Sequence, residues 1–189
     1  MSRRVLMVAG SYYPQNVAGA HRAATLARYL GESGYQPTVL CPAWTAANSG
    51  KLFDPELAGR GELCPTVRVP YPLGRWTWHW TPLGGLAEAV WPYRAPPRLG
   101  RRMLAAGRRL CRQERFDVVW STFKPGLCHH VARALAGQFD MYWVADFRDL
   151  PDQTRTNWRI RRTVAAEGRF VADASQSGNA ARHRGSDVG

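Results

Sequence analysis

Short apolar runs alternate with helical patterns along most of the chain. The run over residues 5–9 is continuously apolar and ends at Gly10, which is typical of a strand buried in a parallel sheet. A helical pattern follows over residues 23–30 and is closed by Gly31, and a second apolar strand is predicted over residues 37–41. This strand–helix–strand opening indicates a doubly wound sheet.

The same alternation continues towards the C-terminus. Further strands are predicted over residues 66–69, 116–120 and 141–145, and helices over residues 98–115, 125–137 and 155–171. Residues 43–65 are expected to be loop-like, within a long loop or insert region over residues 43–97. The predicted fold class is α/β, a Rossmann-like parallel sheet flanked by helices. It forms one domain over residues 1–174, followed by a flexible tail over residues 175–189.

Polar and glycine residues collect where the predicted strands end. They are Gly10 to Gly19 after the first strand, Ser121 and Lys124 after the fourth, and Asp146, Arg148 and Asp149 after the fifth. Because ligands of parallel sheets bind at the carboxyl ends of strands, we expect these residues to form a site. The glycine spacing fits neither the dinucleotide-binding fingerprint nor the P-loop, which argues against NAD-dependent oxidoreductases and P-loop NTPases. An ordinary loop and a structural Arg–Asp pair remain the alternatives.

His129 and His130 are adjacent in a predicted helix. Neighbouring helical residues point in different directions, so at most one of the two can face a cleft, and a structural role is the alternative for either. No third ligand stands at metal spacing, so no metal is expected. The four cysteines show no C-x-x-C pair, which fits a reducing cytosol.

The charge of the chain points to an anionic partner. Lysine and arginine number 26 against 14 acidic residues, a formal net charge of +12, which suits a nucleic acid, an acidic membrane surface or phosphorylated substrates. The helix at 98–115 gathers arginines on one face, and a tryptophan-rich segment precedes it. The membrane-contact candidates are Arg101, Arg102, Arg108, Arg109, Arg112, Trp76, Trp78 and Trp80. A solvated outer helix face is the alternative.

Localisation follows from two further patterns. No apolar stretch is long enough to span a membrane, and the run at residues 5–9 is too short for a signal peptide. The protein is therefore expected to be cytoplasmic, with any membrane contact peripheral, on the inner face of the plasma membrane. No nucleic-acid-binding signature is visible, so no nucleic-acid partner is expected.

Several short motifs occur in an order that points to a known family. They are Tyr12-Tyr13-Pro14, Ala18-Gly19-Ala20-His21-Arg22, Leu26-Ala27-Arg28-Tyr29-Leu30, Thr38-Val39-Leu40, Phe116 to Ser121, Trp143 to Leu150, and Glu167 with Ala172-Asp173-Ala174. Together they resemble the N-terminal domain of retaining, family 4 glycosyltransferases of the GT-B fold. The resemblance covers roughly residues 3–175. It is strongest to enzymes that act on lipid-linked sugars in cell-surface polysaccharide assembly.

The resemblance implies a role for several of these residues. The enzyme would transfer a sugar from a nucleotide-sugar donor to a lipid-linked or saccharide acceptor, with retention and without a metal or other cofactor. Gly19 would approach the donor phosphate together with Arg22, although Ala18 replaces the first glycine of the family's pair. His129 or His130 would be the cleft histidine. Asp146, Arg148 and Asp149 would match the Asp-x-Arg-Asp turn.

One part of the family pattern does not appear. The donor-binding C-terminal domain carries a Glu-x7-Glu pair, and nothing similar occurs before Gly189. We therefore hypothesise a truncated product, a frameshift near residue 175, or a half-enzyme completed by a separate chain. The rival functions are a non-enzymatic, basic peripheral-membrane or assembly module and, less favoured, a nucleic-acid binder.

Overall fold

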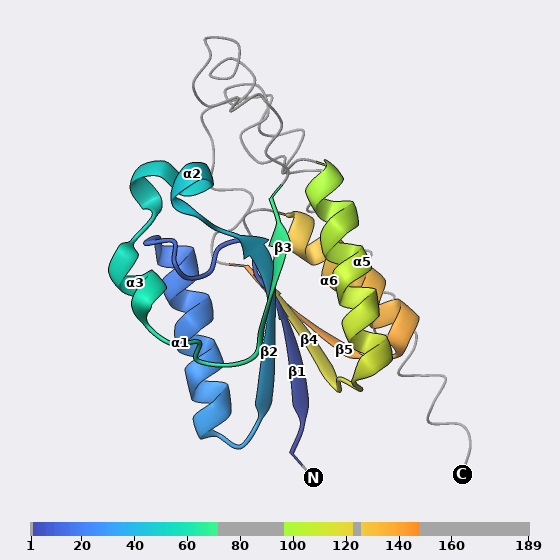
Figure 1. Cartoon of the computed structure of the whole chain (residues 1–189). Coiled ribbons are helices and arrows are strands. Elements are labelled where there is room, and N and C mark those ends of the chain that lie inside the picture. The colour runs from blue at the N-terminus through green and yellow to red at the C-terminus, as the bar shows by residue number, and fades with distance from the viewer. Residues whose placement is uncertain (1, 72–96, 123–125, 148–189) are drawn as a thin grey trace, which may run out of the picture.

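The fold is built on one parallel β-sheet. A computed structural model describes residues 2–71, 97–122 and 126–147. The strands in this part of the chain are β1 (Arg4–Val8), β2 (Gln36–Ala43), β3 (Thr66–Pro70), β4 (Val118–Thr122) and β5 (Tyr142–Asp146). All neighbouring pairs are parallel, in the order β3-β2-β1-β4-β5 (Figure 1). The predicted fold class, a Rossmann-like α/β sheet flanked by helices, is confirmed.

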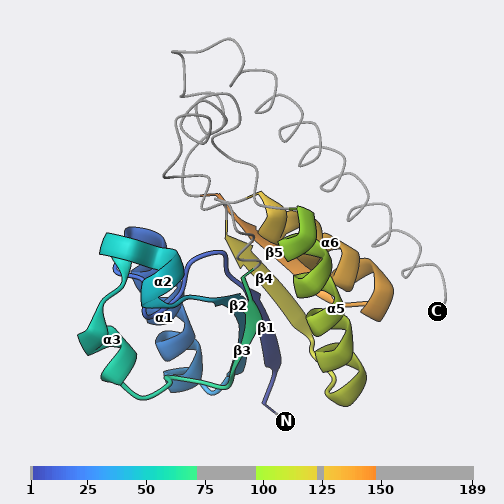
Figure 2. The ribbon, with the colours of Figure 1, turned by 45° about the horizontal axis from the view of Figure 1, so that its top comes forward.

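Helices cover both faces of this sheet. Those described are α1 (Ala18–Glu32), α2 (Ala46–Ser49), η1 (Gly50–Leu52), α3 (Pro55–Gly59), α5 (Pro97–Gln113) and α6 (Leu127–Phe139). The first four lie on one side, and α5 and α6 lie side by side on the other (Figure 2). The chain therefore changes face when it passes from the β1–β2–β3 half of the sheet to the β4–β5 half.

The central strand β1 has its side chains in two separate cores. Val5 and Met7 pack with the alanines of α1, whereas Leu6 and Val8 pack with the side chains of α5 and α6. Because both faces of β1 are covered by helices, polar residues at alternate positions would be buried without partners. The continuous apolar run of this strand follows from that position.

The expectation that residues 43–65 are loop-like is wrong, because three short helical segments lie there. The Asp54 side chain caps the third of them by accepting hydrogen bonds from the backbone N–H groups of Glu56 and Leu57, at 2.9 and 3.2 Å. Pro55 occupies the first helical turn, where its missing N–H costs nothing. An acidic cap followed by proline is a recognised signal for the start of a helix, so the sequence did carry this information.

Two glycines allow α5 and α6 to pack closely. A Cβ atom added at Gly100 would lie 2.5 Å from Cδ1 of Leu127, and one added at Gly107 would lie 2.5 Å from Cδ1 of Leu135. Both distances are shorter than van der Waals contact. The absence of a side chain at these positions therefore sets the approach of the two helices, and Arg108 of α5 adds a hydrogen bond to Gln138 of α6 at 2.8 Å.

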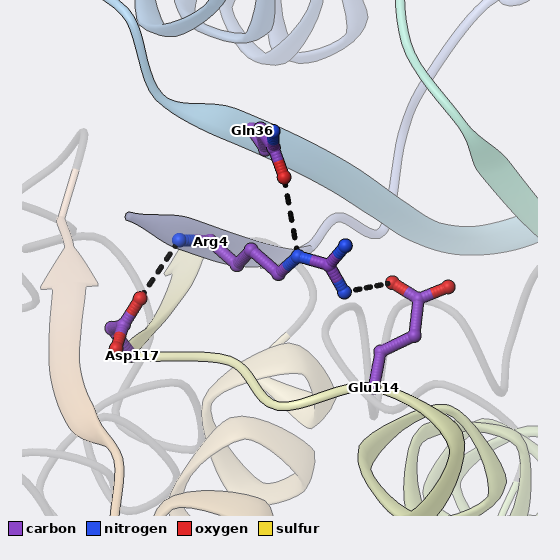
Figure 3. A network of polar contacts seen from close by, with 4 residues as sticks. All are labelled: Arg4, Gln36, Glu114 and Asp117. Carbon is purple, nitrogen blue, oxygen red and sulfur yellow. Dashed lines mark hydrogen bonds and ion pairs between the residues drawn. The ribbon is translucent and has the colours of Figure 1, made fainter. Parts of the chain in front are cut away.

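A polar network links the amino-terminal ends of neighbouring strands in the sheet (Figure 3). The guanidinium of Arg4 on β1 donates to Gln36 on β2 at 3.1 Å and pairs with Glu114 beyond α5 at 3.1 Å. The backbone N–H of Arg4 donates to the carboxylate of Asp117, just before β4, at 2.8 Å. This edge is opposite the one where a ligand site is expected, so we assign the network to stability.

Several predicted features fall outside the described residues. They are the helix at 155–171, the tail at 175–189, and the three tryptophans of the segment before α5. Within the described ranges, every helix is too short or too polar to cross a membrane.

Candidate functional site at the carboxyl edge of the sheet

The strand order identifies where a ligand site belongs. β1 and β4 are neighbours in the sheet, and the connections that follow them lead to α1 on one face and to α6 on the other. A crevice forms outside the carboxyl ends of the strands at such a switch point, because the two following segments diverge there. The carboxyl ends of β1, β4 and β5 thus lie at one edge of the sheet.

The best-defined contact at this edge joins Arg22 and Asp146. The guanidinium of Arg22, in the first turns of α1, donates through Nε and Nη2 to the two carboxylate oxygens of Asp146, at 2.8 and 2.7 Å. Asp146 ends β5 and is largely buried, whereas Arg22 is half exposed. This bidentate pair raises the pKa of Arg22 and holds a fixed cation beside the start of α1.

The N-terminus of α1 faces the same edge without a side-chain cap. Val17 precedes the helix and provides no capping hydrogen bond, and the first turn contains no acidic residue. Gly19 lies in that turn rather than in the preceding loop. An uncapped N-terminus with a neighbouring arginine has the charge that a phosphate group needs.

Ser121 and His129 form a buried polar cluster beneath this edge. Nε1 of Trp143 donates to Oγ of Ser121 at 2.8 Å, and the same hydroxyl lies 2.8 Å from Nδ1 of His129. Because tryptophan can only donate, Ser121 accepts from it, and the same hydroxyl is also hydrogen-bonded to Nδ1 of His129. Ser121 is fully buried and holds His129 in place, and its predicted contact with a substrate stays a prediction.

The two adjacent histidines have different environments. His129 is buried, and its ring lies against Phe147 with centroids 4.6 Å apart, whereas His130 is much more exposed and only partly covered by its neighbours. Burial lowers the pKa of His129 to about 4, with Asp146 opposing the shift and His130 adding to it. The pKa of His130 is also lowered, first by burial and then by Arg133. At neutral pH the buried imidazole is therefore uncharged, which suits a hydrogen-bonding role better than that of a charged acid.

A second polar chain at this edge was not among the predicted site residues. The hydroxyl of Tyr13 lies 3.0 Å from Nδ1 of His21, and Nε2 of His21 lies 2.8 Å from Oδ1 of Asn16. Asn16 in turn donates to Asp54 at 2.9 Å. The chain links the loop after β1 to the cap of α3. A tyrosine, an asparagine and a histidine close to a strand end were the signal in the sequence.

The remaining predicted residues divide into two groups. Lys124, Arg148 and Asp149 lie outside the described residues, so their place at this edge stays a prediction. The arginines predicted on α5 are exposed, although Arg102 donates to the carbonyl of Pro70 at 3.2 Å and Arg108 donates to Gln138 at 2.8 Å. They are Arg101, Arg102, Arg108, Arg109 and Arg112. Among the described residues no three potential metal ligands cluster.

Comparisons with known proteins concern the fold. No model of a protein family and no curated sequence matches the chain. Among solved structures, the chain is similar to the glycosyltransferase SsfS6 of Streptomyces sp. SF2575, with a TM-score of 0.50 and 17% identity over 87% of this chain and 44% of that chain. It is also similar to CalG4, the calicheamicin glycosyltransferase, with a TM-score of 0.50 and 16% identity over 89% of this chain and 36% of that one.

The C-terminal domain of the PF1911 hydrogenase from Pyrococcus furiosus aligns over 77% of this chain and 93% of its own, with 13% identity and a TM-score of 0.47. At these identities the comparisons establish the fold alone. The chain spans less than half the length of the two glycosyltransferases it resembles.

Proposed function

We propose that this chain is the acceptor-side half of a glycosyltransferase that moves a sugar from a nucleotide-sugar donor to a saccharide acceptor. The supporting observation is the meeting of three elements at one edge: the uncapped start of α1, the Arg22–Asp146 pair and the neutral His129. The first two favour a diphosphate, and a neutral imidazole suits sugar hydroxyls. The similarity of fold to two glycosyltransferases supports the architecture.

The finer assignment extends the motif resemblance. We propose a family 4, retaining enzyme that needs no metal and acts on a lipid-linked acceptor in cell-surface polysaccharide synthesis. The donor domain would be supplied by further sequence or by a separate chain. The DNA directly downstream tests this point, because a reading frame with a second Rossmann half and a Glu-x7-Glu pair would encode such a donor domain.

A transfer assay tests the function itself. The chain is mixed with the product of that downstream frame, a panel of radiolabelled nucleotide sugars and a lipid extract, and label in the lipid phase is measured. We expect Asp146→Asn to lower transfer by at least about tenfold, because it weakens the pair that fixes Arg22. Asp117→Asn, at the opposite edge of the sheet, is the matched control and should leave transfer unchanged. Equal activity of both variants would contradict the proposed site.

A second candidate function is attachment to an anionic membrane, favoured by the exposed arginines of α5. We expect the chain to sediment with vesicles that contain phosphatidylglycerol, and to remain in solution with phosphatidylcholine alone. Replacing Arg101, Arg109 and Arg112 by glutamine should abolish sedimentation. Replacing Arg3, Arg28 and Arg60, which changes the net charge equally, should weaken it only slightly. Equal loss in both triple variants would indicate a response to net charge and not a membrane-binding helix.

A further inference from the structure

A cavity of about 380 Å³ lies on the other side of β1 from the site described above. Its walls come from the loop after β1, the segment that leads from β2 into α2, the α3 region and the edge strand β3. The lining includes Tyr13, Trp44, Phe53, Arg60, Glu62 and Arg68. A volume of this size is at the lower end of the range for small-molecule sites, so its ligand would be small.

Hydrogen bonds and ring contacts hold the aromatic walls of this cavity in place. Nε1 of Trp44 donates to the carbonyl of Gly10 at 3.2 Å, and its ring lies 5.1 Å from that of Tyr71. The hydroxyl of Tyr13 is hydrogen-bonded to His21 at 3.0 Å. A ligand that enters therefore does not have to order these side chains, which reduces the entropic cost of binding.

The charged wall is held by one hydrogen bond and one partly exposed ion pair. Arg68 on β3 donates to the backbone carbonyl of Tyr13 at 2.7 Å, and its Nε lies 3.4 Å from a carboxylate oxygen of Glu62. These contacts use only part of the N–H groups of the guanidinium, which can donate further hydrogen bonds. The cavity thus offers donors from the arginine and acceptors from the glutamate within one small volume.

The combination selects a class of ligand. The carboxylate of Glu62 would repel an anion, and the guanidinium groups of Arg68 and Arg60 would repel a cation. A purely apolar molecule would cover the charged pair without replacing its hydration, which costs free energy. A neutral ring with an apolar C–H face and several hydroxyl groups satisfies both walls. Its face packs on Tyr13, Trp44 or Phe53, and its hydroxyls both accept and donate hydrogen bonds.

We propose that this cavity binds a neutral sugar ring, as a saccharide site separate from the edge where transfer would occur. The proposal does not depend on transferase activity, because Trp44, Glu62 and Arg68 are not among the residues of the transfer site, although Tyr13 also belongs to the polar chain at that edge. If the chain proves to have no part in transfer, sugar binding here is still expected. If the cavity binds no sugar, the site around Arg22 and Asp146 is unaffected.

Nuclear magnetic resonance of the isotope-labelled full chain provides the test. The probes are the methyl glycosides of glucose, galactose and mannose, with indole as an apolar probe and inorganic phosphate as an anionic probe. We expect at least one glycoside to shift the indole N–H signal of Trp44 and the backbone signal of Arg68, with a Kd in the millimolar range. Neither indole nor phosphate should produce these shifts at the same concentration.

Variants locate the binding. Trp44→Leu and Arg68→Met should each weaken binding of that glycoside by at least about tenfold. Arg22→Met, which alters the site at the carboxyl edge of the sheet, should leave glycoside binding unchanged. The titration of the unaltered chain decides the question even if a cavity variant does not fold. Glycoside shifts confined to the residues around Asp146 would overturn the proposal. So would indole binding as strong as that of the sugars, or no shift at Trp44 with any glycoside.

Discussion

Mild acid should destabilise this fold through one buried histidine. Burial lowers the pKa of His129 from 6.5 to about 4. Between these values the unfolded chain takes up a proton that the folded protein does not, so stability is fully present above the unfolded pKa and falls as the pH decreases towards 4. Each pH unit is worth about 1.4 kcal/mol. The complete fall is therefore about 3 kcal/mol, a large part of the ~5–15 kcal/mol that stabilises a typical domain.

The magnitude needs little correction for solvent, because His129 is only 2% exposed. Urea unfolding followed by circular dichroism, from about pH 7.5 to about pH 5, should record about 2 kcal/mol of this loss while most carboxylates remain charged. His129→Gln removes the titrating group, so its unfolding free energy should depend less on pH, whatever its absolute stability.

One result would refute this reasoning. If the unaltered chain and His129→Gln lose stability in parallel over this range, the imidazole is already protonated in the fold or is more solvated than its burial indicates. Ser121→Ala gives an independent check, because it leaves Nδ1 of His129 and the N–H of Trp143 without the hydroxyl between them. A loss of about 1–3 kcal/mol at neutral pH is expected for this variant.

Other substitutions test the packing, the cap and the edge network, each by the midpoint of urea unfolding. Gly107→Ala should destabilise by about 1 kcal/mol, because the crowding of buried Leu135 outweighs the gain in helix propensity. Gly137→Ala, with open space around it, should stabilise by about 0.5 kcal/mol; equal effects of the two would contradict the packing argument. Asp54→Ala should cost about 1 kcal/mol through loss of its cap, and Asp54→Asn should recover most of it. Arg4→Met should cost less than about 1 kcal/mol, because its ion pair is exposed, and a larger loss would indicate that the edge network is cooperative.

The sequence carried most of the information about the sheet. The apolar runs that became β1, β4 and β5 could be located to within about two residues. A strand buried on both faces, such as β1, must be apolar throughout, whereas β5 at the end of the sheet keeps an apolar run although Tyr142 and Val144 are exposed. The exposed arginine face of α5 followed from helical spacing in the same way. The short helices between β2 and β3 were missed, because brief segments contain too few residues for a periodic signal, although their caps could have been found.

The sequence also placed Gly19, Arg22, Ser121, His129 and Asp146 near strand ends, and the topology brought those ends to one edge. It could not say which side chains would meet there. A structural Arg–Asp pair within its own turn was the alternative considered for Asp146, yet its partner in the fold is Arg22, 124 positions earlier in the chain. Similarly, only packing of α6 against the sheet distinguished the buried His129 from the exposed His130. Local spacing determines the elements and the edge they share. Pairing across the edge, burial and the resulting pKa values depend on distances between segments remote in sequence, and only the tertiary structure sets those distances.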